Sequence, residues 1–289
     1  SDFKLPDLFS AADSASYKSQ YLYLLLIRIE YGLLLAAAIL TLFREPNQWV
    51  LLLYALIFIA SLGTLLTRAT LKPEQAWYKA RALAESVKTL SWRYAMRAEP
   101  FDDKDEPEAT SDLSRRLTSL LRANSQLGSH LVQLDTSGSQ ITPEMQELRN
   151  KPLIQRLEFY REHRVKDQLV WYTNKATQNK RAAQLWLLAG ALAYGLALFL
   201  VIYSALFASG PTAVEPLIVF ASAALGWMQI KKHNELASSY ALTAHEIGLS
   251  MVVLDAVDTE LSLSSATNEI ELAFSREHTQ WVARVDGQS

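Results

Sequence analysis

The sequence predicts an all-α integral membrane protein with four transmembrane helices in two hairpins and with extended cytoplasmic helices. Half of its 289 residues are hydrophobic, a fifth are charged, and the apolar residues form four long runs. Crossing roughly 30 Å of hydrocarbon takes about 20 apolar residues in a helix, which is close to the length of each run. The runs come in two tight pairs, so a soluble bundle of fully buried helices is the weaker alternative.

Composition also excludes several classes of protein. The high hydrophobic content excludes a disordered chain. The sequence contains no cysteine, which excludes a disulfide-stabilised scaffold and a thiolate metal site.

The four runs define the predicted spans, at residues 21–43, 49–66, 185–207 and 213–230. Five residues separate the two spans of each pair, which is enough only for a turn, and in the second pair they include Gly210 and Pro211. Basic residues favour the cytoplasmic side, and Arg44 is the one basic residue in the two connecting loops. We therefore expect a multi-pass membrane protein with both termini cytoplasmic.

Most of the remaining chain has the pattern of helices that extend the spans into the cytoplasm. Helices are expected at residues 73–99, at 112–134, from 153 unbroken into the third span, from the fourth span unbroken to about 261, and at 267–285. Pro73 is suited to open the first of these, because its missing N–H is not needed there. Residues 100–111 read as an acidic loop, and residues 135–139 interrupt the helical pattern.

The same plan, a hairpin followed by an exit helix, appears twice along the chain. We accordingly divide the chain into a first hairpin domain at residues 1–99, an acidic loop and linking helix at 100–150, and a second hairpin domain at 151–289.

One stripe of the first exit helix combines charge with an aromatic ring. Arg81, Glu85, Lys88 and Trp92 follow each other at i, i+4, i+7 and i+11, and Arg93 and Arg97 lie nearby. One interpretation is an internal ion-pair ladder, worth tenths of a kcal/mol per pair. The other is a ligand site in which the cations face phosphates while Trp92 or Tyr94 stacks on a base.

A second basic group lies just inside the third and fourth spans and consists of Lys175, Lys180, Arg181, Lys231 and Lys232. Its default interpretation is a positive-inside anchor at the membrane surface. In a ring-shaped oligomer the same residues would line a vestibule, so they remain ligand-binding candidates.

Polar residues within the predicted spans are candidates for an intramembrane function or a pore wall. They are Arg28, Glu30, Ser61, Thr64, Ser204, Glu215, Ser222 and Gln229. Ionisable groups are costly in a membrane unless they face protein or water. Membrane helices also use small polar residues for packing, and Glu215 also suits the start of a helix.

No enzyme motif stands out in the sequence. A phosphate-binding loop is missing, and the five histidines show no i, i+4 metal spacing. We therefore expect a protein that is not an enzyme, with no catalytic residue, metal or cofactor.

Three segments resemble the SLATT family, the SMODS- and SLOG-associating two-transmembrane effector domains. The tail at residues 266–284 (ATNEIELAFSREHTQWVAR) and the segment at 171–180 (WYTNKATQNK) resemble one subtype. The segment at residues 76–101 (AWYKARALAESVKTLSWRYAMRAEPF) resembles another, so the chain is similar to a tandem form. Residues 100–150 match least.

The resemblance implies a membrane effector of a bacterial anti-phage system, encoded beside a nucleotidyltransferase that makes a nucleotide messenger. Such effectors are thought to form pores that depolarise the inner membrane and cause cell death or growth arrest. The implied partners are copies of the chain in a tetramer or larger ring, the lipid bilayer, a cyclic or linear oligonucleotide, and ions. Whether the ligand opens the pore or holds it shut stays open.

Two other functions remain alternatives. The protein would be a non-conducting membrane scaffold if the acidic loop or the tail recruits a cytoplasmic partner. A small-ion transporter would need alternating access between the two hairpins, which parallel repeats support poorly.

Overall fold

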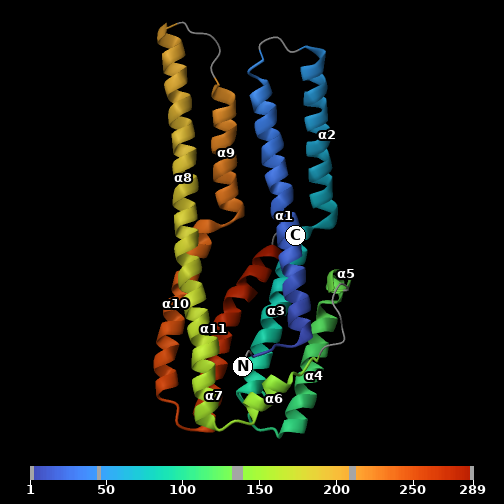
Figure 1. Ribbon diagram of the computed structural model, residues 1–289, viewed down its shortest axis with the longest axis vertical. Helices are drawn as coiled ribbons and strands as arrows, with labels where there is room; N and C mark the ends of the chain where they lie inside the picture. Colours follow the sequence, from blue (N-terminus) through green and yellow to red (C-terminus); the bar gives the residue numbers. More distant parts are fainter. Residues whose placement is uncertain (1–2, 44–46, 132–138, 208–212, 287–289) are drawn as a thin grey trace. The chain divides into compact units, whose positions relative to one another are not determined.

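The chain is 87% helical in a computed structural model, and the residues it describes, 3–43, 47–131, 139–207 and 213–286, contain no strand. The longer helices are α1 (Asp7–Leu40), α2 (Gln48–Leu71), α3 (Pro73–Ala95), α4 (Glu106–Ala123), α8 (Asp167–Phe207), α9 (Val214–Ile230), α10 (His233–Asp255) and α11 (Glu260–Asp286) (Figure 1). Shorter elements are a 3₁₀ turn (Ser125–Leu127), α5 (Gly128–Leu131), α6 (Pro143–Arg149), α7 (Leu153–Tyr160) and a π-helix (Arg161–Lys166).

The helices divide into two compact units. Residues 21–72 and 175–238 form one, which we call the span unit, and residues 1–20, 73–174 and 239–289 form the other, which we call the core unit. Each unit takes segments from both halves of the chain.

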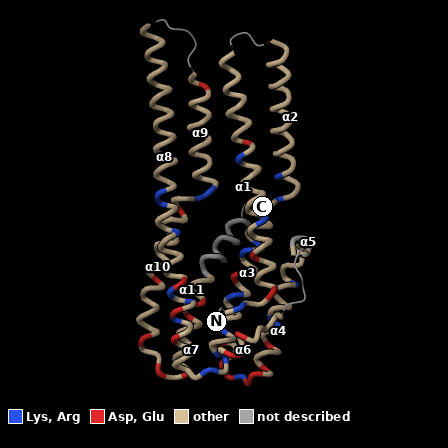
Figure 2. Tube along the Cα trace, in the orientation of Figure 1, with Lys and Arg blue, Asp and Glu red and all other residues tan. Residues whose placement is uncertain are grey.

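Among the described residues, three helices are long and apolar enough to cross a membrane, and they cover residues 21–40 of the first predicted span and all of the second and third. They are Asp7–Leu40, Gln48–Ala95 and Leu153–Phe207. Within them the apolar stretches carry almost no charge, as the α2 and α8 traces of Figure 2 show. Large side chains such as Phe58 and Leu192 are more than 60% exposed, as lipid-facing residues are.

The fourth predicted span remains a prediction. It corresponds to α9, whose 17 residues extend about 26 Å at 1.5 Å per residue. That length is at the lower limit for a transmembrane helix. Small residues on α9 allow close packing within the span unit, since a Cβ added to Gly190 of α8 would lie 3.7 Å from the Ala221 carbonyl oxygen.

Two predicted helix boundaries are wrong for local reasons. The helix predicted at residues 112–134 begins six residues earlier, at Glu106, because the Asp105 side chain accepts a hydrogen bond from the Glu108 N–H (2.9 Å). It ends at Ala123, and part of the predicted range lies outside the described residues. The acidic loop is therefore partly helical.

The fourth span does not continue unbroken to residue 261. The chain turns at Lys231 and Lys232, and Lys232 adopts a left-handed backbone with φ of 50°. After α10, the last helix begins at Glu260 rather than at residue 267. The Thr259 hydroxyl accepts from the Ser262 N–H (3.2 Å) and the Ser262 hydroxyl accepts from the Thr259 N–H (3.0 Å), which caps α11 reciprocally.

The predicted unbroken helix into the third span is confirmed from Leu153 to Phe207. Within it, residues 161–166 form the π-helix, in which the backbone turns are wider than in an α-helix.

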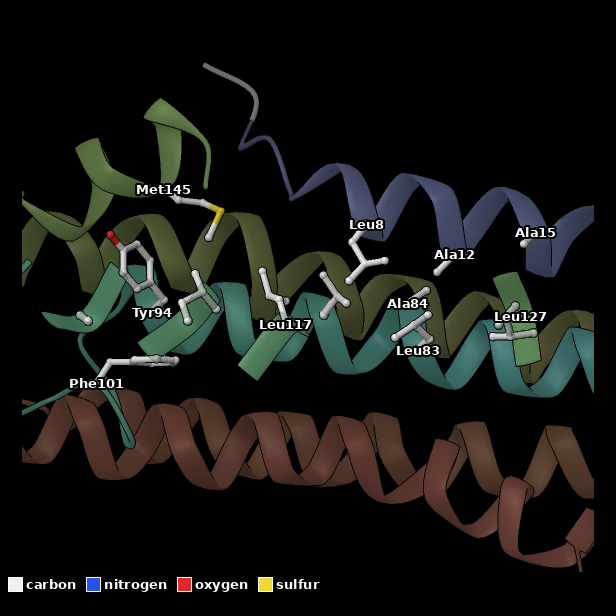
Figure 3. Close-up of a cluster of buried hydrophobic side chains, with 14 residues drawn as sticks. Leu8, Ala12, Ala15, Leu83, Ala84, Tyr94, Phe101, Leu117, Leu127 and Met145 are labelled. Carbon is white, nitrogen blue, oxygen red and sulfur yellow. The ribbon is translucent and has the colours of Figure 1, made fainter. Parts of the chain in front are cut away.

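The core unit is built around α3. Figure 3 shows Leu8, Ala12 and Ala15 of α1 on one side of α3, close to its Leu83 and Ala84, and these five residues are at most 9% exposed. On another side α3 packs along α11. Both faces of α3 are therefore covered.

Candidate functional site

The centre of the core unit is one buried carboxylate, that of Glu271 on α11. It accepts hydrogen bonds from Arg164 Nε (2.8 Å) and Nη2 (2.7 Å), from the Tyr160 hydroxyl (3.0 Å) and from the Thr89 hydroxyl (3.0 Å). Glu271 is fully buried and Arg164 is 1% exposed. The carboxylate thus joins α11 to α3, α7 and the π-helix through four donors, which we call the Glu271 centre.

The electrostatics of this centre keep the arginine charged and the tyrosine neutral. Burial alone would lower the pKa of Arg164, but the Glu271 carboxylate raises it above its ordinary value. Burial and Glu271 together raise the pKa of Tyr160. The guanidinium also lies 4.5 Å from the centroid of the Phe274 ring, while its Nη1 has no hydrogen-bond partner among the described residues.

The predicted stripe on α3 begins as an ion-pair ladder. Arg81 contacts Glu85 (2.8 Å) and also Asp13 of α1 (3.4 Å). Glu85 is buried, so this pair is stronger than an exposed i, i+4 pair. The structure therefore places Arg81 where it ties α1 to α3 at the rim of the core unit.

Lys88 is a half-buried cation held near other cations. Burial lowers its pKa, the charges of Arg164 and Arg81 lower it further, and Glu85 and Glu271 act in the opposite direction. A lysine whose charged form is disfavoured in this way destabilises the folded protein at neutral pH. An anionic ligand would relieve that cost.

The aromatic residues of the stripe are covered by protein. Trp92 is 3% exposed and stacks on Phe3 with ring centroids 4.1 Å apart. Tyr94 is fully buried, with its ring edge against Phe101 and its hydroxyl 2.8 Å from the Thr110 hydroxyl. A base would stack on Trp92 only if Phe3 moved away.

The two arginines near the stripe, Arg93 and Arg97, contact backbone carbonyls. Arg93 Nη2 donates to the Asn268 carbonyl (3.5 Å), and burial lowers the Arg93 pKa. Arg97 Nε donates to the Arg149 carbonyl (2.9 Å). Of the stripe and its neighbours, the structure thus brings Lys88 and Arg93 near Glu271, while Arg81 faces α1 and Arg97 lies just beyond the C-terminal end of α3.

Three buried arginines were not identified from the sequence: Arg149, Arg156 and Arg164. Arg149 donates to the Tyr94 (2.7 Å), Phe101 (3.0 Å) and Lys104 (2.9 Å) carbonyls, and Arg156 Nη1 donates to the Met96 carbonyl (2.8 Å). Cations at these positions supply donors to carbonyls in the last turn of α3 and in the segment that follows it. Their function is to hold that end of the helix.

The acidic segment contains a local charge cluster. Asp112 contacts Lys104 (2.8 Å), Arg116 (3.1 Å) and Arg115 (3.3 Å). The hydrogen bond from Lys104 is the main reason that the pKa of Asp112 is lowered. In the scaffold alternative, acidic residues of this region recruit a partner protein. The Asp112 carboxylate is already paired with nearby cations of the same chain.

In the span unit the predicted basic group separates into two sets. Lys180 and Arg181 are exposed on α8. Lys231 lies close enough to Arg28 and Lys175 that their charges, after burial, lower its pKa. Lys232 occupies the turn between α9 and α10.

The polar candidates within the predicted spans differ in their surroundings. Arg28 lies over the Trp227 ring (5.2 Å to the centroid), Glu30 pairs with Arg68 (2.9 Å), and the Thr64 hydroxyl donates to the Ser61 carbonyl (2.8 Å). Ser204 is partly buried on α8. On α9, Glu215, Ser222 and Gln229 are all exposed and stand seven residues apart. These three therefore share one face of α9.

Among the described residues, no group of three or more histidine, aspartate or glutamate side chains is placed to hold a metal ion.

Two family models match the chain in tandem. The model of SMODS and SLOG-associating 2TM effector domain 3 matches residues 6–157, and that of SMODS and SLOG-associating 2TM effector domain 1 matches residues 160–281. No curated protein and no solved structure matches the chain. The matches confirm the tandem resemblance expected from the sequence.

We expect Glu271→Gln to lower the free energy of unfolding by about 3 to 5 kcal/mol, because it leaves the Arg164 charge buried without its partner. Unfolding of the purified protein in detergent, followed by circular dichroism, measures the change. Glu269→Gln is the matched control, since Glu269 is exposed on the same helix. Equal stability of the two variants would contradict the assignment, whereas the double variant Glu271→Leu with Arg164→Met should recover much of the loss.

We expect Lys88→Met to raise the midpoint of thermal unfolding at pH 7, because burial disfavours the lysine charge and methionine keeps the apolar stem. Since the folded-state pKa is lowered, the gain should shrink as pH rises through that pKa and the lysine becomes neutral. Lys166→Met, at an exposed position, is the control. A lower midpoint for Lys88→Met would show that Lys88 stabilises the fold.

Proposed function

Because this chain belongs, as a tandem, to the SMODS and SLOG-associating two-transmembrane (SLATT) effector family, we propose that it is a membrane effector of a bacterial anti-phage system that forms a pore. The pore is an oligomer of the chain in the inner membrane, with both termini and the core unit in the cytoplasm. Its opening depolarises the membrane and stops growth or kills the cell.

The observation that carries the proposal is the polar face of α9. Glu215, Ser222 and Gln229 are exposed on an otherwise apolar helix, at a spacing that keeps them on one side. Such residues are costly against lipid and are favourable against water or a polar partner. In a ring of subunits this face supplies the pore wall, and Glu215 forms a ring of negative charge that favours cations.

The other charged pair of the span unit is unsuited to this role. Glu30 of α1 and Arg68 of α2 neutralise each other at 2.9 Å, so their charges serve helix pairing. The Thr64 hydroxyl is likewise occupied by the backbone of its own helix. These contacts leave α9 as the helix with the most polar groups available to a pore.

The second part of the proposal is control by a nucleotide or oligonucleotide at the Glu271 centre. Lys88 and Arg93 supply cations near a carboxylate that already holds Arg164, and the charge of Arg81 reaches Lys88. Arg164 lies in the same continuous helix, Leu153–Phe207, as the third predicted span. A phosphate that binds Lys88 and competes with Glu271 for Arg164 would act directly on that helix.

The ligand acts by its different affinities for the closed and open arrangements of the spans. Two directions of control agree with this scheme. In one, ligand binding opens the pore, and in the other, ligand binding holds the pore closed until the ligand is removed.

We expect Glu215→Gln to reduce the preference of the pore for cations over anions severalfold, because it removes the proposed ring of charge. Reversal potentials under a salt gradient in planar bilayers measure the preference. Glu158→Gln, which removes an exposed charge in the core unit, is the control. An unchanged reversal potential would exclude α9 as the wall, and absence of any conductance would favour the scaffold alternative.

We expect Arg81→Gln with Lys88→Gln to weaken the response to cyclic di- and trinucleotides at least tenfold without preventing membrane insertion, because two phosphate-binding charges are lost. Ion flux from vesicles containing the protein measures the response. The control, Arg122→Gln with Lys166→Gln, removes the same charge from exposed positions. An equal response in both double variants would remove the α3 stripe from the mechanism.

A further inference from the structure

The segment before α1 places an aromatic ring on the indole of Trp92. Phe3 lies against Trp92 with ring centroids 4.1 Å apart and ring planes inclined by 26°. Aromatic pairs in proteins more often have centroids about 4.5–7 Å apart, in offset or edge-to-face arrangements. A short, nearly parallel contact is how a flat base stacks on an aromatic side chain. Phe3 thus occupies the position that a stacked base would take.

Other aromatic rings surround the same position. The Phe159 centroid lies 6.2 Å from those of both Phe3 and Trp92. Tyr160 meets the indole edge-on at 5.6 Å. His163 lies 4.4 Å from Phe159 and is exposed, while Phe3 and Phe159 are half-buried. Without Phe3, these rings would line a slot with Trp92 at its floor and with Phe159 and His163 toward the surface.

A cation and the Glu271 centre lie next to this position. Lys88 and Trp92 are four residues apart on α3, so they lie on the same face, separated by about one helical turn of 5.4 Å. Tyr160, whose ring contacts the indole, and Arg164 both donate to the Glu271 carboxylate. A ligand that combines a flat ring with a phosphate would therefore find both of its contacts along one face of α3.

The polar contacts that hold Phe3 in place are weak ones. The Thr142 hydroxyl donates to the Lys4 carbonyl (2.8 Å), which is a hydrogen bond between neutral groups. The Lys4 ammonium lies 3.8 Å from Glu144, and the lysine side chain is 72% exposed, so this ion pair adds little. Leu8 keeps the start of α1 on α3 independently of Phe3 (Figure 3). Release of Phe3 therefore breaks weak polar contacts and exchanges one aromatic stack for another.

We propose that Trp92 and Phe159 form the stacking site for the base of a phosphate-bearing ligand, and that Phe3 occupies this site as an internal competitor. The inference rests on the nucleotide control proposed above and adds to it the place of the base. Binding exchanges the Phe3 ring for the base, and the phosphate contacts Lys88. A protein whose binding-competent form is only partly populated binds its ligand more weakly by that fraction. Phe3 thus sets the ligand concentration to which the effector responds.

The test is calorimetric titration of the full chain in detergent with cyclic di-AMP, which carries two bases and two phosphodiesters. We expect Phe3→Ala to bind it at least fivefold more tightly than the wild type, because the competitor is removed. Trp92→Ala, added to Phe3→Ala, should abolish this gain. Every base has a π-face, so the result does not depend on the identity of the base. Unchanged, weaker or undetectable binding by Phe3→Ala would overturn the proposal.

The matched control is Phe9→Ala. Phe9 is also half-buried, and it packs against the apolar cluster that contains Leu8 and Leu83. Its removal costs a similar amount of packing without vacating the position on Trp92, so the affinity should stay within twofold of the wild type. Phe3→Tyr keeps the stacked ring and should also bind as the wild type does. An equal gain in Phe9→Ala and Phe3→Ala would indicate general loosening and would overturn the proposal.

Two further measurements separate the stacking site from nucleotide control. Inorganic pyrophosphate has no base, so the wild type and Phe3→Ala should bind it equally, and a gain in Phe3→Ala would overturn the stacking site. If Arg81→Gln with Lys88→Gln weakens cyclic di-AMP binding while Phe3→Ala leaves it unchanged, the stacking site fails and nucleotide control survives. If Phe3→Ala binds more tightly but ion flux from vesicles does not respond to the ligand, the stacking site survives and control of the pore fails.

Discussion

The arrangement of the core unit depends on one ion pair, between Glu271 and Arg164, that is almost completely removed from water. Desolvating two charges costs several kcal/mol per ion, and their attraction repays this only with good geometry and further hydrogen bonds. Here the guanidinium gives two parallel hydrogen bonds, and Tyr160 and Thr89 occupy the remaining acceptor sites of the carboxylate. Four donors with fixed directions specify the rotation of α11 against α3 and the π-helix, which apolar packing alone would specify less sharply.

The same pair explains why charge is concentrated around α3. The Glu271 carboxylate pairs with Arg164, and its negative charge only partly stabilises the charged forms of the nearby Lys88 and Arg93. Burial has the larger effect, so the pKa values of both residues are lowered. Arg149 and Arg156 avoid this competition because their acceptors are backbone carbonyls and, for Arg156, the separate carboxylate of Glu260. The buried cations of the core unit therefore differ in whether they have acceptors of their own or lie near the shared acid Glu271.

The sequence predicts the parts that follow from periodicity and hydropathy. The helical class, three helices long and apolar enough to cross a membrane, and the unbroken helix from Leu153 are of this kind. It does not reveal the break after Ile230, because two lysines continue a helical pattern as readily as they interrupt one. The buried arginines were missed because an arginine looks the same in sequence whether it faces water or carbonyls. A signal for Glu271 was present: it follows Ile270 and precedes Phe274 by three on the apolar stripe of α11, where an acid needs a buried partner.

The π-helix has a consequence for how the two family domains are joined. The first domain match ends at residue 157 and the second begins at residue 160, next to the π-helix at Arg161–Lys166. The buried residues Arg156, Tyr160 and Arg164 follow each other at intervals of four and lead into the π-helix, whereas Val165 within it and Tyr172 beyond it are seven apart. Arg164 and Val165 are both buried, so the inward face of the helix shifts by one residue at this point. The wide turn thus shifts the buried face of the continuous helix by one residue. The segments before and after it can therefore each keep their own pattern of buried residues.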